Sequence, residues 1–128
     1  LLAARLAEEA TGADEYGLFL QEIKQPAKFD VFALAEQLQR IEPFRVIHWL
    51  QQWCYDLGSA KLTGMVRYHP YLADLIKNLS SNIAIFDLLR YQNELITAKR
   101  EALHPLNPKL LFESILLSYR HMMLGADR

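Results

Sequence analysis

The stretch LLRYQNELITAKREALHPLNPKLLFESILLSY, residues 88–119, decides the fold class of this 128-residue chain. Its apolar residues recur every three to four positions on both sides of a central break, which is the spacing of amphipathic α-helices. His104-Pro105 ends the first helix, because a residue before proline avoids helical backbone angles. Asn107-Pro108 begins the second with a cap residue and a proline in the first turn.

The helix before the break is predicted to run from about Ser81 to Leu103 and to be the longest in the chain. At 100° per residue its apolar side chains fall on one arc, with acidic and basic residues on the opposite side. We expect this arc to face the core. It contains Ile85, Leu88, Leu89, Tyr91, Leu95, Ile96, Ala102 and Leu103.

The helix after the break, predicted over 108–124, is apolar on two sides and therefore needs two neighbours. The broader side contains Leu111, Phe112, Ile115, Tyr119, Met122 and Met123, and we assign it to the domain's own core. The narrower side repeats every seven residues at Leu110, Leu117 and Leu124, with Arg120 and His121 among its charged neighbours. An apolar strip with a charged rim is typical of a protein interface. These five residues are the candidate subunit interface.

The same helical spacing extends towards the N-terminus. Helices are predicted over about 2–10, from Asp14 to Pro26, from Asp30 to Ile41, over 43–57 and from Pro70 to Leu79, with a loop over Gly58–Pro70. Pro43 suits the first position of its helix, since its missing N–H would have no intrahelical partner there. No alternating pattern of β-branched residues interrupts the series. The sequence predicts an all-α fold, a single-domain bundle of about five or six helices.

Composition indicates a packed domain: 52% of the residues are hydrophobic and 23% charged, with five glycines and five prolines. This balance excludes disordered and low-complexity classes.

The apolar runs are too short for a membrane span. The single cysteine, Cys54, cannot form an internal disulfide, which favours a cytoplasmic location. Because the chain begins with Leu1 inside a helical pattern, we expect it to be a piece of a longer protein.

Charge is divided unevenly along the chain. Residues 1–42 contain four basic and eight acidic side chains, and residues 43–128 contain ten and seven. The net charge of +3 on residues 43–128 is too small for a nucleic-acid-binding surface, which needs basic side chains clustered on one face. We therefore expect no strong direct DNA binding.

Motifs for catalysis or cofactor binding are absent from the sequence, which has no phosphate-binding loop, dinucleotide fingerprint or serine elbow. Glu101 and His104 have the spacing of a di-iron ligand pair, but the second pair that such a site needs is missing. Cys54 lies on an apolar arc and is expected to be buried. The loop residues 67–70, RYHP, are expected to anchor their loop by hydrogen bonds to helix ends. No cofactor or metal is predicted.

Three stretches together resemble a known family: WLQQWCYDL (49–57), RYHP (67–70) and the stretch 88–119 quoted above, of which HPLNPKLLFE and LLSY are the most specific parts. They are similar to the C-terminal domain of the delta-prime subunit of bacterial DNA polymerase III, in its beta- and gamma-proteobacterial form. The resemblance covers about residues 14–122. It implies a non-catalytic helical oligomerisation domain, which packs with neighbouring subunits into the collar of the clamp loader.

The resemblance also implies a domain organisation and partners. Residues 1–12 would be the end of a preceding lid region and residues 13–128 the collar domain, and the partners would be the delta and gamma/tau type subunits of the DNA-directed DNA polymerase III holoenzyme. The family's arginine finger and zinc-binding cysteines belong to a module that precedes this region, so no catalytic or metal role passes to any residue here. The alternative is a ligand-binding or regulatory helical domain with an aromatic pocket between Trp49, Trp53 and Tyr55.

Overall fold

The computed structural model describes residues 15–103 and 107–125, and its regular structure within these ranges is helical throughout. Helical residues 15–23 are followed by α2 (Val31–Leu38), α3 (Pro43–Thr63), the 3₁₀ turn η1 (Pro70–Leu72), α4 (Ala73–Ser80), α5 (Ile85–Glu101) and α6 (Pro108–Leu124). The predicted all-α single-domain bundle is confirmed. The expected helix over 2–10, the Asp14 cap and the His104-Pro105 break lie outside the described residues.

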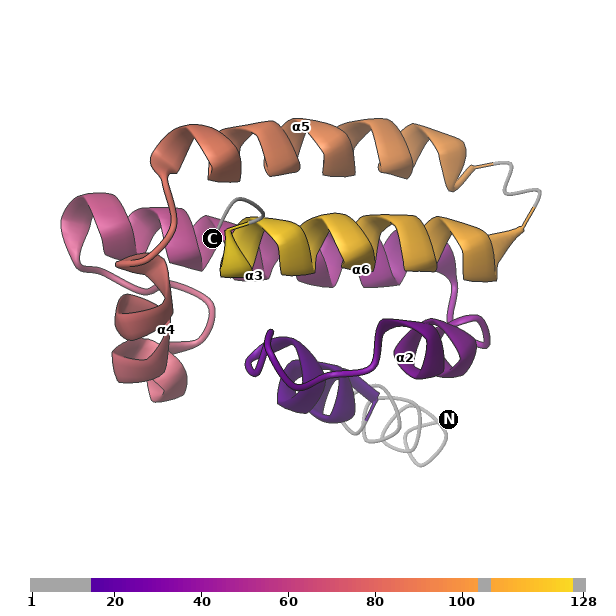
Figure 1. Ribbon diagram of the computed structural model, residues 1–128, viewed down its shortest axis with the longest axis horizontal. Helices are drawn as coiled ribbons and strands as arrows, with labels where there is room; N and C mark the ends of the chain where they lie inside the picture. The colour runs from indigo at the N-terminus through magenta and orange to yellow at the C-terminus, as the bar shows by residue number, and fades with distance from the viewer. Residues whose placement is uncertain (1–14, 104–106, 126–128) are drawn as a thin grey trace, which may run out of the picture.

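Three long helices form the centre of the molecule. In Figure 1, α5 lies above α6, and α6 lies in front of α3. The chain runs in the same direction along α3 and α6 and in the opposite direction along α5 (Figure 1). α5 packs against both α3 and α6, while α2 packs against α6 and α4 against α3. A single core therefore lies between these helices.

Local signals set the helix starts as predicted. The Asp30 carboxylate accepts hydrogen bonds from the backbone N–H groups of Phe32 (3.0 Å) and Ala33 (3.1 Å), which caps α2. The Asn107 side chain accepts one from the N–H of Leu110 (3.1 Å) and caps α6. Pro43 and Pro108 occupy the first turns of α3 and α6. These contacts satisfy N–H groups that have no partner within their own helix.

The prediction that α3 ends near residue 57 and is followed by a loop over 58–70 is wrong. α3 continues to Thr63, which makes it 21 residues long, and it ends at Gly64 in the left-handed conformation with φ 77°. Gly58 lies inside the helix, where a Cβ would be 3.2 Å from Cδ2 of Leu88. Gly58 therefore allows close packing with α5, and the helix-ending role falls to Gly64.

The extent and the buried face of α5 also differ from the prediction. The helix begins at Ile85 and has 17 residues, so α3 is the longer helix. Leu89 and Ile96, which were expected in the core, are 53% and 46% exposed, and Leu103 is exposed as well. α5 has neighbours on one side only, where Leu88, Tyr91, Leu95 and Ala98 are buried. The apolar arc is wider than the contact surface that α3 and α6 offer.

Buried hydroxyl groups connect the elements across the core. The Tyr119 hydroxyl accepts a hydrogen bond from Nε1 of Trp53 (2.9 Å) and donates one to the carbonyl oxygen of Ile23 (2.7 Å). The Tyr91 hydroxyl donates to the carbonyl oxygen of Ile115 (2.7 Å). These bonds join residues 15–23, α3, α5 and α6 at defined positions. They give the large aromatic side chains polar partners inside the core.

Candidate subunit interface

The narrow apolar side of α6 is at the surface. We call Leu110, Leu117 and Leu124 the α6 strip: Leu110 is 61% and Leu124 44% exposed, and Leu117 is half-buried against the core. On the opposite side of the helix the buried residues are Phe112, Ile115, Leu116, Tyr119 and Met123, with Leu111 and Met122 half-buried. The division of the helix into two sides agrees with the sequence pattern at Leu110 and Leu124, whereas Leu117 packs partly against the core. Leu116 is an addition to the core that the pattern did not identify.

The two polar candidates beside the strip differ from each other. Arg120 is half-buried: its Nη1 donates to the carbonyl oxygen of Phe29 (3.2 Å), and its guanidinium lies 5.9 Å from the centre of the Phe29 ring. His121 is exposed. Arg120 therefore links α6 to the segment before α2 by a hydrogen bond. Of the two polar residues, exposed His121 is the one that a partner subunit could contact.

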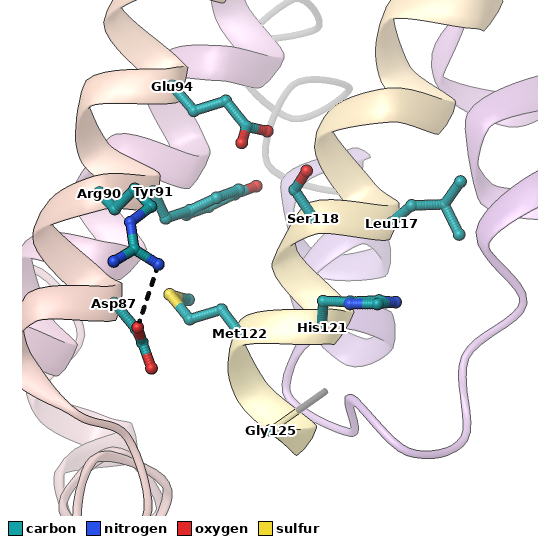
Figure 2. Close-up of a pocket in the computed structure, with 9 residues that line it drawn as sticks. All are labelled: Asp87, Arg90, Tyr91, Glu94, Leu117, Ser118, His121, Met122 and Gly125. Carbon is teal, nitrogen blue, oxygen red and sulfur yellow. Dashed lines mark hydrogen bonds and ion pairs between the residues drawn. The ribbon is translucent and has the colours of Figure 1, made fainter. Parts of the chain in front are cut away.

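A cleft of about 460 Å³ separates the outer edges of α5 and α6. Figure 2 shows Tyr91 and Glu94 on α5 facing Ser118 and Met122 on α6, while Leu117 and His121 point away from α5. Asp87 accepts a hydrogen bond from Nη1 of Arg90 (3.4 Å) at one end. A second hollow continues along the same pair of helices between Glu94, Glu101 and Leu111. The α5–α6 edge is thus lined with carboxylates.

Hydrogen bonds anchor residues 67–69 as predicted, but the anchor is the Asp56 side chain inside α3 and not a helix end. Its carboxylate accepts hydrogen bonds from the backbone N–H groups of Arg67, Tyr68 and His69 at 2.9 to 3.1 Å and from Nδ1 of His69 at 2.8 Å. Asp56 and His69 are both buried. With Nδ1 as donor, Nε2 of His69 accepts from the Tyr16 hydroxyl. The sequence analysis did not identify Asp56. The feature that could have indicated its role is its position as a lone carboxylate next to the apolar arc of α3.

The rings proposed for an aromatic pocket have separate environments. Trp53 is fully buried and bonded to Tyr119, while Trp49 packs against Tyr16 and Phe19 at centroid distances of 5.1 and 5.4 Å. Tyr55 is exposed and lies 5.6 Å from Tyr68. The two tryptophans serve as packing residues on the inner side of α3.

The remaining candidates for chemistry are also placed by the structure. Cys54 is buried, as predicted, and burial raises the pKa of its thiol well above the ordinary range, which disfavours the nucleophilic thiolate. Glu101 is exposed, and His104 lies outside the described residues. Within 15–103 and 107–125, no three His, Cys, Asp or Glu residues are grouped as a metal site requires. Across the same ranges, no helix has the length and apolar character of a membrane span.

The architecture defines an all-α domain with an apolar strip on the exposed side of α6. A family model described as DNA polymerase III, delta subunit, C terminal matches residues 13–121. The chain belongs to this family and is a domain of a DNA polymerase III clamp-loader subunit. Neither the curated proteins nor the solved structures give a match.

Proposed function

We propose that this chain is the collar domain of a delta-prime subunit, a non-catalytic oligomerisation domain of the clamp loader that works in the cytoplasm. Its role is to pack with neighbouring subunits of the delta and gamma/tau type in the complex that loads the sliding clamp onto primed DNA. The observation that carries the proposal is the α6 strip, in which Leu110 and Leu124 are exposed and Leu117 is half-buried, on a helix that is already buried on its other side.

The family match supports the coarser part of this proposal, because it identifies a clamp-loader subunit domain. The delta-prime assignment rests on the resemblance of HPLNPKLLFE (104–113) and LLSY (116–119). We further propose that residues 13–128 form the collar domain and that residues 1–12 are the end of a lid region. The start of the family match at residue 13 supports that boundary.

The α6 strip has the chemistry of an interface. Isolated exposed leucines are common on protein surfaces, but leucines repeated every seven residues form one continuous line along a helix. Such a line becomes favourable to bury when a second helix packs against it, since burying apolar surface contributes about 25 cal/mol per Å². Exposed His121 and Ser114 beside the line supply a polar rim.

Binding to purified delta and gamma/tau subunits tests this function. We expect the wild-type chain to bind at least one of them and Leu110→Arg/Leu124→Arg to weaken that binding by about tenfold or more, as loss of central apolar contacts does. Phe32→Arg, which alters an equally exposed side chain on α2, is the matched control. Circular dichroism of each variant checks that it is folded.

Two results would reject the proposal. The first is a wild-type chain that binds none of the purified subunits. The second is a folded Leu110→Arg/Leu124→Arg variant with wild-type affinity for all of them, which would remove the α6 strip from the interface.

A further inference from the structure

A second apolar line lies on the outer side of α3 and α5. We call Phe44, Tyr55, Leu89, Ile96 and Leu103 the α3–α5 strip, and each of these side chains is exposed. Leu89, Ile96 and Leu103 are seven residues apart, as in the α6 strip. Contiguous apolar surface of this kind marks an interaction site more often than scattered exposed residues do.

Contacts between the two helices show that the strip is continuous. Nζ of Lys99 lies 4.5 Å from the centre of the Phe44 ring, and Ile96 and Leu103 lie one helical turn before and after Lys99. Further along, Nε2 of Gln92 donates to the carbonyl oxygen of Gln51 (3.4 Å). Leu89 and Tyr55 are each one turn beyond that contact. Phe44 therefore lies towards the Ile96 end of the strip, and Tyr55 lies towards its Leu89 end.

The charged side chains of α5 that lie beside the strip are basic. Lys99 and Arg100 lie in the last turn of α5, beside Ile96 and Leu103. The only carboxylate of α3, Asp56, is buried against the 67–69 backbone and His69. The carboxylates of α5, at Asp87, Glu94 and Glu101, line the opposite edge of that helix, next to α6. A partner that covers the strip therefore gains most if carboxylates flank its own apolar face.

The strip also faces away from the first candidate interface. In Figure 1, α6 lies in front of α3. The α6 strip lies on the side of α6 opposite the buried residues of that helix. The α3–α5 strip lies beside the Gln92–Gln51 and Lys99–Phe44 contacts, where α5 meets α3, and α3 lies behind α6 in the same view. A domain with apolar strips on two sides can contact two neighbours at once, which is the arrangement of heterologous head-to-tail assemblies.

We propose that the α3–α5 strip is a second subunit-docking surface, which binds an apolar helix face flanked by Asp or Glu residues on a neighbouring clamp-loader subunit. This inference rests on the proposed function. It adds a second neighbouring subunit, which would contact the domain at the α3–α5 strip. Leu89 and Ile96 supply the central apolar contacts, and Arg100 pairs with the partner's carboxylates at one end. The α6 strip serves the other neighbour.

Binding to the same purified subunits tests two features of the proposed surface: the apolar contacts of the strip and the positive charge beside it. We expect Leu89→Asp/Ile96→Asp to weaken binding to one subunit by about a hundredfold and Leu89→Arg/Ile96→Arg to weaken it less, because carboxylates on the partner repel only the first variant. Leu18→Asp, at an exposed leucine on residues 15–23, is the matched control.

Exposed Arg100, at one end of the strip, gives a test that does not depend on the apolar variants folding. Arg100→Glu should weaken the same binding by about tenfold at low salt and less at high salt, whereas Arg100→Lys should bind like the wild type. Equal affinities of Arg100→Glu and Arg100→Lys would overturn the charge assignment and with it the proposed partner.

The outcomes separate this inference from the proposed function. If Leu89→Asp/Ile96→Asp binds every subunit like the wild type while Leu110→Arg/Leu124→Arg does not, the second surface is wrong and the collar function stands. If the wild-type chain binds no subunit, the collar function itself is wrong. The inference would also be overturned if the control variant Leu18→Asp were folded but bound none of the subunits, because the loss of binding would then not be specific to the strip.

Discussion

The inner and outer sides of α3 reverse the usual distribution of polarity. On the inner side, Asp56 and the indole N–H of Trp53 are buried, and each has hydrogen-bond partners. On the outer side, Phe44 and Tyr55 are exposed to solvent. Among the described residues, every buried side-chain nitrogen or oxygen has a partner. Specific polar pairs thus accompany the apolar packing on the inner side of α3, while apolar side chains stay exposed on its outer side.

The largest expected effect is at Asp56. Asp56→Ala removes the acceptor for three backbone N–H groups and for the His69 ring, so we expect the free energy of unfolding to fall by about 3–5 kcal/mol. Urea denaturation measures this loss. Asp74→Ala, at an exposed carboxylate in the first turn of α4, should change stability by about 0.5 kcal/mol or less. A loss below about 1 kcal/mol at Asp56 would show that the inner side does not depend on this residue.

The next effect is at Tyr119. Tyr119→Phe leaves the Trp53 N–H and the Ile23 carbonyl without their partner, which should cost about 1–3 kcal/mol. Tyr55→Phe, on the outer side, should leave the urea midpoint close to that of the wild type. If both variants were equally stable, the contrast between the two sides of α3 would fail.

A smaller effect is expected from Cys54 at alkaline pH. In the unfolded chain the thiol ionises near its ordinary pKa of about 8.5, whereas burial raises the pKa of the native thiol well above this value. The native state therefore keeps a proton that the unfolded state loses, and stability falls by up to about 1.4 kcal/mol per pH unit above pH 8.5. Urea denaturation at pH 8 and pH 10 should show a smaller fall for Cys54→Ala. Equal falls in both proteins would mean that the native thiol also ionises.

The smallest effect on stability belongs to the outer leucines. Leu89→Ser and Leu110→Ser should each change the free energy of unfolding by about 0.5 kcal/mol or less, because both side chains are already exposed. Thermal melts measure this, and Leu95→Ser, at a fully buried position of α5, is the contrasting variant. A loss at Leu89 as large as that at Leu95 would place it in the core and remove the α3–α5 strip.

Local chemistry made part of this structure predictable. Asp30, Asn107, Pro43 and Pro108 act within one helical turn, so their positions as caps and first-turn residues could be read from neighbouring residues. Helical periodicity also predicted the buried Cys54 and most of the buried side of α6, with Leu116 as the exception.

The errors arose where a distant segment decides the outcome. Gly58 resembles a helix end in sequence, but its meaning comes from the close approach of Leu88, thirty positions away. Leu89 and Ile96 belong to the apolar arc of α5, and only the number of helices packed against that arc decides which of its residues are buried. The role of Asp56 required knowing where residues 67–69 return to α3.

The attachment of three successive amides to one carboxylate has a dynamic consequence. The N–H groups of Arg67, Tyr68 and His69 share a single acceptor group, so they are released together or not at all. Surface connections between helices ordinarily exchange their amide hydrogens through small local openings. Because Asp56 is buried in the interior of α3, we expect the amides of residues 67–69 to exchange with deuterium as slowly as the central turns of that helix.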